Sequence, residues 1–350
     1  MSYFEKIKNL PLAKDPIIMG IETSCDETAV AIVKNGREVL ADEIISSATE
    51  HARFGGVVPE IASRTHTTAI LTATERALKS ANLSLNDIDA FAVTEGAGLL
   101  GALLVGVSFA KALAFSTGKP LVPVSHIRGH ISASYIADKK LEPPFITILA
   151  SGGHTAIIAV DDYYNLKVLG STLDDAVGEA FDKVARVLGL NYPGGPNVER
   201  LAREGENVIK LPKMLKNYDG GDYDFSYSGL KTAVINYVHN QQSKGVEINK
   251  ADVASSFQHS AIDVLVDKAF KAVKECGYKT LAVSGGVGAN GYLREALEKR
   301  AKKENVYLVL PEKRYCTDNG AMIGAEGYLQ YQRRNFADLT LNAKAVVPLK

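Results

Sequence analysis

The chain has 350 residues, more than the roughly 250–300 at which a single hydrophobic core stops growing, so we expect two domains. Its 46% apolar and 23% charged residues are typical of a soluble globular enzyme. Forty basic and forty acidic residues give zero net charge, which argues against sequence-independent clamping of nucleic acid by bulk charge. An RNA partner would therefore be bound by a local patch or together with other subunits.

The first sixteen residues are mixed in charge and contain neither an apolar core nor a small-residue cleavage site, so they do not resemble a signal peptide. No uninterrupted apolar run approaches the roughly 18 residues that span a bilayer. The three cysteines are an odd number without ligand-like spacing, which indicates a reducing compartment and no disulfide framework. We expect a cytoplasmic protein without a membrane partner.

The first half predicts a three-stranded meander followed by a helix. Ile17–Thr23 and Glu27–Val33 have the apolar pattern of strands, and Asn35-Gly36 is a strong hairpin signal leading into a third strand at Arg37–Ile44. Apolar residues then recur at helical spacing over Val58–Leu78.

The second half repeats this plan. Phe145–Ser151, His154–Val160 and Leu166–Leu169 predict another meander. Helical spacing follows at Ala176–Leu188 and at Ala251–Cys276. Both halves of the chain therefore begin with the same arrangement of strands.

A second repeat accompanies the first. Phe91–Gly98 recurs 190 residues later as Leu281–Gly288, and each copy is an apolar strand that runs into a glycine-rich turn and then a helix. Further parallel strands are predicted at Leu121–Val124 and Val306–Leu310. The two repeats together predict two related α/β domains around a cleft.

Pro143-Pro144 marks the expected domain boundary. We expect an N-terminal extension at 1–16, a first domain at 17–143 and a second at 144–350. Within the second domain, residues 191–230 are rich in glycine, proline, tyrosine and aspartate and predict a long loop or insert. Loops of this length are usually functional.

His126 and His130 are four residues apart and face the same side if the segment is helical. The offset of 190 residues carries His126 to Cys316, within two residues of Asp318. Spacing alone favours a structural histidine pair, but with Asp318 in register two imidazoles and a carboxylate could meet across the cleft. Such a ligand set suits iron or zinc.

Ser151-Gly152-Gly153 follows a predicted strand, where glycines let backbone N–H groups approach an anion. Alone, this turn is more often a tight turn than a phosphate cradle. Paired with Gly285-Gly286 at the end of another strand of the same domain, it indicates a nucleotide site.

Other candidate residues have ordinary structural interpretations when taken alone. Taken alone, Asp182 and Glu199 are expected to be solvated carboxylates on helices, and Asp26 is expected to be a turn residue. Cys25 and Cys316 have no identifiable histidine partner and read as small buried thiols.

The duplicated meander with parallel strands and helices is the plan of the actin, sugar-kinase and heat-shock-chaperone ATPase superfamily. Within it, the chain resembles the universal tRNA threonylcarbamoyltransferase family, TsaD-type in bacteria and Kae-type in archaea and eukaryotes, over roughly residues 17–330. The motifs that carry the resemblance are Ile21–Thr28, Gly55–Glu60, Ala62–Arg64, His126–His130, Ser151–Thr155, Gly178–Lys183, Tyr192–Pro196, Phe225–Lys231 and Cys316–Met322.

The resemblance implies transfer of a threonylcarbamoyl group from threonylcarbamoyl-AMP to N6 of the adenosine 3′ of the anticodon, in tRNAs reading ANN codons, with release of AMP. It implies one divalent metal, iron or zinc, on His126, His130 and Asp318. Asp26 or Glu27 would deprotonate the attacking amine. The substrate-binding positions it implies are Leu149, Ala150, Ser151, Gly152, Gly153, Asp182, Gly195, Glu199 and Asn290.

The resemblance also implies partners, namely tRNA, a paralogous TsaB-like subunit and a small TsaE-like ATPase. Archaeal members have a tyrosine just before the Ser-Gly-Gly turn, where this chain has Leu149. Because this chain lacks that tyrosine as a fourth protein ligand, the open coordination positions of the metal would be taken by substrate.

Three other functions are alternatives to the transferase. A metallopeptidase predicts a glutamate directly after the first histidine, where this chain has Ile127. A non-catalytic scaffold of the same fold would be expected to lose the metal ligands, and all three are present. A kinase or chaperone-like ATPase of the superfamily is disfavoured by the same three ligands.

Overall fold

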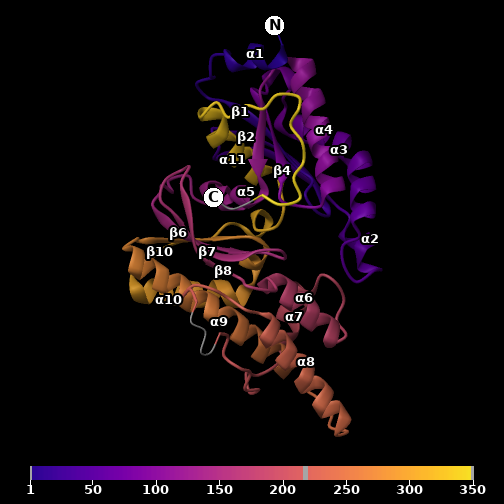
Figure 1. Cartoon of the computed structure of the whole chain (residues 1–350), viewed down its shortest axis with the longest axis vertical. Helices are drawn as coiled ribbons and strands as arrows, with labels where there is room; N and C mark the ends of the chain where they lie inside the picture. The colour runs from indigo at the N-terminus through magenta and orange to yellow at the C-terminus, as the bar shows by residue number, and fades with distance from the viewer. Residues whose placement is uncertain (1, 216–219, 348–350) are drawn as a thin grey trace. The chain divides into compact units, whose positions relative to one another are not determined.

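The computed structural model describes residues 2–215 and 220–347, which form two compact units (Figure 1). Unit 1 runs up to Leu141 and resumes at Asp318, and unit 2 comprises Glu142–Thr317. The sequence alone predicts that all of 144–350 lies in the second domain. The C-terminal part instead belongs to unit 1, because its last helix packs on the sheet of that unit. Residues 1, 216–219 and 348–350, which fall within the expected extension, insert and second domain, lie outside the described residues.

Unit 1 is built on a five-stranded sheet of order β3-β2-β1-β4-β5. Its strands are β1 (Ile17–Glu22), β2 (Glu27–Lys34), β3 (Glu38–Ser46), β4 (Ala90–Gly96) and β5 (Leu121–Ser125). Its helices are α1 (Tyr3–Lys8), α2 (Ala48–Ala52), α3 (Pro59–Ala81), α4 (Leu100–Thr117), α5 (His126–Ala137) and α11 (Gly320–Gln332), with a 3-10 turn at Leu85–Asp87.

Unit 2 has a second five-stranded sheet, of order β10-β9-β6-β7-β8. Its strands are β6 (Phe145–Ala150), β7 (Thr155–Val160), β8 (Leu166–Ser171), β9 (Thr280–Ser284) and β10 (Tyr307–Val309). Its helices are α6 (Val177–Val187), α7 (Gly194–Ala202), α8 (Ser228–Ser243), α9 (Lys250–Cys276) and α10 (Gly291–Glu304), with 3-10 turns at Gly286–Ala289 and Lys313–Tyr315.

The two sheets confirm the predicted duplication. In unit 1, β2 pairs antiparallel with both β1 and β3, while β4 pairs parallel with β1. In unit 2, β7 pairs antiparallel with β6 and β8, while β9 pairs parallel with β6. The predicted meanders and glycine-turn strands therefore occupy equivalent positions in the two units.

The sheet of unit 1 is buried on both faces because alternate residues of each strand point to opposite sides. Met19 and Ile21 of β1 belong to a core formed with α3 and α4. Ile18 packs on the other face with residues of α11 and α5. Figure 1 shows these two helices on the side of the sheet opposite α3 and α4. Gly20 lies so close to α11 that a Cβ atom would be 2.2 Å from the carbonyl oxygen of Gly320. The chain can bring α11 onto β1 only where both backbones lack side chains.

Among the described residues, α4 is the one helix apolar and long enough to cross a membrane by length and composition. Its buried residues include Leu103, Val107 and Ala110, and the helix packs against α3 and β4. It therefore serves as a partly buried core helix of unit 1.

The region expected to be a long insert is partly helical. Its described residues include α7 and the first turn of α8, joined to the sheet where Phe225 pairs with Thr172. The N-terminal extension contains α1, whose Ile7 is fully buried.

Candidate metal centre and substrate site

The two histidines lie on the first turns of α5, which begins directly after β5 ends at Ser125. Because the residues are four apart on a helix, their rings lie on one face, with centroids 4.6 Å apart and nearly perpendicular planes. Asp318 lies in the turn just before α11, whose N-cap Asn319 accepts a hydrogen bond from Met322 N at 2.8 Å. Both segments belong to unit 1, so the three candidate ligands come from one unit rather than from opposite sides of a cleft.

These three side chains are close enough to share one ion. Asp318 Oδ1 is 3.2 Å from His130 Nε2 and 3.6 Å from His126 Nε2. One potential ligand atom from each residue lies within 4.8 Å of the others. Both histidines are buried and Asp318 is half-buried, which leaves a side open to solvent or substrate.

His130 supplies the observation that best tests whether these residues fit a metal. The residue is 2% exposed, and its Nδ1 has no hydrogen-bond partner among the described residues, while its Nε2 faces Asp318 Oδ1 at 3.2 Å without the geometry of a hydrogen bond. Burying an unsatisfied polar group is costly, so buried imidazoles are normally hydrogen-bonded or bound to a metal. Two nitrogens and one carboxylate oxygen are donors suited to zinc or iron.

His126 is held by a carboxylate that the sequence analysis missed. Glu22, at the end of β1, is fully buried, and its Oε2 lies 2.9 Å from His126 Nδ1. Ser24 Oγ is 3.1 Å from the same nitrogen. Glu22 lies within the Ile21–Thr28 motif, but the sequence assigned it no role, because a glutamate at a strand end is ordinarily solvent-exposed.

The electrostatics of this cluster favour a positive charge. Burial by itself would lower the pKa of His126, but the nearby carboxylates of Asp318 and Glu22 raise it to about 9. The metal-free site therefore holds a proton on His126 at neutral pH. A divalent cation bound to Nε2 would take the place of that positive charge.

The proposed general bases lie in the same unit, at the turn between β1 and β2. Asp26 is buried, and Glu27 accepts a hydrogen bond from Ser46 Oγ at 3.1 Å. Burial, followed by the charges of Asp318 and Asp26, raises the pKa of Glu27 to about 9. In the metal-free protein Glu27 is therefore protonated at neutral pH.

The cysteines have the environment of structural thiols. Burial and the neighbouring carboxylates raise the pKa of Cys25 far above its usual range. Cys316 is buried, and burial raises its pKa also. Neither residue has the lowered pKa of a nucleophilic cysteine.

In unit 2, two glycine turns lie at the carboxyl ends of adjacent parallel strands. Leu149 and Ala150 end β6, and Leu149 pairs with Ser284 of β9. Gly285 follows with φ of 88° and lies against Ala150, so this position requires glycine. At Gly152 and Gly153 an added Cβ atom would meet nothing within 4 Å.

The helix residues assigned to the adenosine part also lie in unit 2 and are linked by backbone contacts. Asp182 on α6 accepts from Gly194 N at 2.7 Å, while Glu199 on α7 accepts from Gly291 N at 3.1 Å. Asn290 caps α10 by accepting from Leu293 N at 3.0 Å. Burial raises the pKa of Asp182, against the hydrogen bonds from the start of α7.

These contacts correct the interpretation of Asp182 and Glu199 as solvated carboxylates. Each holds the first turn of another helix by accepting from a backbone N–H group. At Gly195, between them in the sequence, an added Cβ atom would meet nothing within 4 Å. Unit 2 thus presents an open backbone beside carboxylates that are already oriented.

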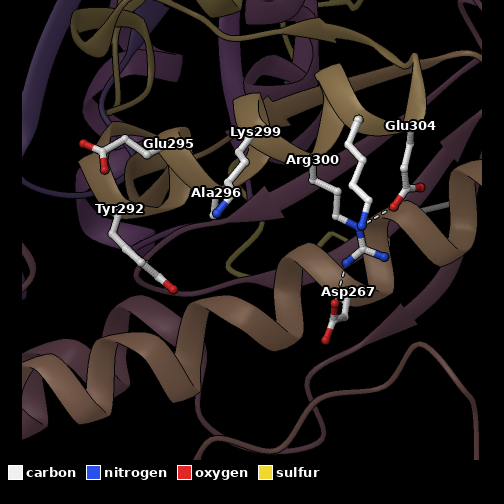
Figure 2. Close-up of a pocket in the computed structure, with 8 residues that line it drawn as sticks. Asp267, Tyr292, Glu295, Ala296, Lys299, Arg300 and Glu304 are labelled. Atoms are coloured by element: carbon white, nitrogen blue, oxygen red, sulfur yellow. Dashed lines mark hydrogen bonds and ion pairs between the residues drawn. The ribbon is translucent and has the colours of Figure 1, made fainter.

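A separate hollow of about 680 Å³ lies between α9 and α10 (Figure 2). Its lining mixes both charges, and Arg300 is paired with Asp267 and Glu304. None of the residues proposed for metal or substrate lines it.

Solved structures with a similar fold place the chain among actin-like α/β proteins. Full-length HypF, in its phosphate- and nucleotide-bound form, aligns with a TM-score of 0.61 at 16% identity, covering 93% of this chain and 48% of HypF. The (R)-2-hydroxyglutaryl-CoA dehydratase component A of Acidaminococcus fermentans aligns with a TM-score of 0.51 at 16% identity, covering 90% and 97%. At these identities the likeness establishes the fold alone.

The sequence comparisons are more specific. The TsaD family model, described as tRNA N6-adenosine threonylcarbamoyltransferase, matches residues 38–325. Proteins of that description from Staphylococcus aureus strains MRSA252 and bovine RF122 / ET3-1 are 51% and 52% identical over 339 residues, which is 97% of this chain and 98% of each relative. The chain belongs to the TsaD family of tRNA N6-adenosine threonylcarbamoyltransferases. The predicted actin-like fold, family and transferase activity are confirmed.

Proposed function

We propose that the enzyme takes the threonylcarbamoyl group from threonylcarbamoyl-AMP, modifies the adenosine 3′ of the anticodon in tRNAs that read ANN codons, and releases AMP. The observation that carries this proposal most directly is the cluster of His126, His130 and Asp318, with Asp26 and Glu27 in the same unit. It provides cation ligands and proton acceptors together.

The reaction is an acyl transfer. N6 of the adenosine attacks the carbamoyl carbon and forms a C–N bond, while the bond from that carbon to the phosphate oxygen breaks and AMP leaves with the electron pair. The N6 proton passes to Asp26, a buried carboxylate in the same unit as the proposed metal ligands. Glu27, protonated in the metal-free protein, lies beside it and is the alternative acceptor once its own proton is lost.

One divalent metal, iron or zinc, would be held by His126 Nε2, His130 and Asp318. When bound it supplies Lewis acidity that stabilises negative charge developing on the carbamoyl oxygen. The open side of the cluster, at half-buried Asp318, leaves room for that oxygen.

The adenylate would be held by residues of unit 2. At Gly152 and Gly153 an added Cβ atom would meet nothing within 4 Å, so their backbone N–H groups would be uncovered, which suits a phosphate. The turn at Gly285 follows the adjacent parallel strand β9. Asp182 and Glu199 would accept hydrogen bonds from ribose hydroxyls, with Gly195 and Asn290 completing the pocket.

We also propose that the chain works in the cytoplasm with a TsaB-like paralogue and a TsaE-like ATPase. Zero net charge gives it little general affinity for tRNA phosphates. Exposed apolar side chains on two helices that pack together, Leu71 of α3 with Leu100, Leu104 and Phe115 of α4, support a protein partner on that face.

The test supplies purified threonylcarbamoyl-AMP and tRNA to the chain, with and without the two partners, and measures N6-threonylcarbamoyladenosine by mass spectrometry. We expect product that depends on the metal and increases with the partners. Full multi-turnover activity of the isolated chain would refute the partner proposal. Absence of product from the complete mixture would refute the adenylate as donor.

A further inference from the structure

Glu22 is a buried carboxylate that has no lysine or arginine partner among the described residues. Its Oε2 accepts from Thr94 Oγ1 at 2.7 Å and lies 2.9 Å from His126 Nδ1, while its Oε1 accepts from Ser24 N. A buried charge is costly unless hydrogen bonds or an opposite charge compensate it. The contacts with Thr94 and Ser24 therefore hold this carboxylate in place, and the third contact joins it to the imidazole of His126.

The contact decides which nitrogen of His126 faces Asp318. The carboxylate beside Nδ1 holds a proton on that nitrogen. The nitrogen that can donate an electron pair to a metal is therefore Nε2, which lies 3.6 Å from Asp318 Oδ1. His130 has no equivalent partner for its Nδ1 among the described residues. The two histidines are therefore not equivalent.

We propose that Glu22 is a positioning residue that fixes the ring of His126 for metal binding and makes its Nε2 a stronger metal ligand. The inference rests on the proposed metal centre. It assigns a role to a residue of β1 that touches neither metal nor substrate.

The test is Glu22→Gln, which keeps the shape of the side chain and removes its charge. We expect Co²⁺ to bind roughly 10–100-fold more weakly in competition with a chelator. We also expect a changed Co²⁺ absorption spectrum, which a merely structural role would not alter. Ser134→Ala is the matched control, because this buried hydroxyl on the same helix has no hydrogen-bond partner among the described residues. It should bind Co²⁺ as the unmodified protein does.

Wild-type affinity and spectrum in Glu22→Gln would overturn the inference while leaving the metal centre intact. If the unmodified protein binds none of Co²⁺, Zn²⁺ and Fe²⁺, the proposed metal centre is refuted, and the role of Glu22 with it. Should Glu22→Gln fail to fold, Thr94→Val removes a donor to the same carboxylate oxygen. We expect a severalfold loss of affinity there, and no loss would also overturn the proposal.

A second, independent observation concerns the connection between α2 and α3. Arg53, Phe54 and Gly55 are exposed at its tip, and Phe54 is 64% exposed. Gly55 has φ of 69°, a conformation that favours glycine and turns the chain sharply after the aromatic residue. This tip, residues 53–56, overlaps the start of the Gly55–Glu60 motif, which the metal and substrate sites do not use.

The tip is held firmly from beneath. Fully buried His51 accepts from Val58 N at 3.2 Å, and its Nε2 lies 3.0 Å from Ser47 Oγ. Ser47 Oγ donates to the carbonyl oxygen of Asp26 at 2.8 Å. The exposed aromatic is thus connected by hydrogen bonds to the segment that carries the proposed base.

We infer that the tip contacts an unpaired base of the tRNA substrate, with Phe54 stacking on the base and Arg53 beside it. Arg53 forms no ion pair among the described residues, so its charge is available to RNA. Loop nucleotides are recognised by stacking on aromatic rings and guanidinium groups. The adenosine modified by this family lies in tRNA, and its reactive N6 must reach unit 1 near Asp26.

In the complete transferase mixture, Phe54→Ala should raise the KM for tRNA about tenfold and leave the KM for threonylcarbamoyl-AMP unchanged. Phe54→Trp should retain binding because the stacking surface remains. Tyr307→Ala on β10 is the control, since Tyr307 is an aromatic residue of similar exposure, 59%, that lies outside the proposed metal, substrate and partner sites. An unchanged KM for tRNA in Phe54→Ala would overturn the inference. So would a loss that excess partner protein restores, because the tip would then be a protein-docking site.

Discussion

Arg128 on α5 donates from Nε to Oε1 of Glu326 on α11 across 2.9 Å. Glu326 is buried, and it also accepts from Ser132 Oγ at 2.6 Å and from Gln330 Nε2 at 2.6 Å. The pair joins the helix that carries both candidate histidines to the helix that follows Asp318. It therefore maintains the spacing of the metal ligands from outside the ligand set.

Arg128→Ala should destabilise the protein by about 3–5 kcal/mol, because Glu326 would remain buried without its cation. Urea unfolding of the metal-free protein measures this change. Arg64→Ala is the control: its ion pair with Glu60 is exposed and should contribute little. Equal effects of the two substitutions would show that the buried pair has no special role.

His126→Ala, His130→Ala and Asp318→Ala should each lower bound metal and transfer activity together. Three ligands leave little redundancy when one is removed. Elemental analysis of purified variants gives the metal content, and His259→Ala in unit 2 serves as a histidine control. Full metal retention in all three variants would remove this site from the mechanism.

Removing the metal should destabilise the protein more at pH 9 than at pH 6. The pKa of His126 rises from 6.5 unfolded to about 9 folded, so its contribution is complete below 6.5 and is lost as pH rises through 9. Glu27, raised to about 9, acts in the same direction. Bound metal replaces the proton and removes this loss. Melting temperatures with and without chelator should diverge as pH rises, and a constant difference would contradict the assignment.

Asp182→Asn and Glu199→Gln should each weaken binding of a non-hydrolysable adenylate analogue by roughly 1–3 kcal/mol. Both amides keep an acceptor for the backbone N–H groups of Gly194 and Gly291, so the fold should be unaffected. Calorimetry measures the affinity. Glu295→Gln is the control, because Glu295 is an exposed carboxylate on α10. Affinity equal to that of the control in both variants would leave the two carboxylates with a purely structural role.

The sequence was sufficient to predict the duplicated sheets, because alternating apolar strands and glycine turns recur in register. The offset of the repeat also predicted that Asp318 lies near His126 and His130. It could not place α11 on the first sheet, since the close approach of Gly20 to Gly320 depends on two backbones 300 residues apart. For the same reason Glu22 escaped notice, as its burial results from how β1, β4 and α5 pack.

The return of the C-terminal segment to unit 1 has a consequence for biosynthesis. Asp318 and α11 leave the ribosome only after all of Glu142–Thr317 has been made. Until then one face of β1 lacks its helix and the histidines lack their carboxylate, so a nascent or truncated chain offers an incomplete site for metal. Completion of the first unit, and with it high-affinity loading, thus depends on translation continuing past α11.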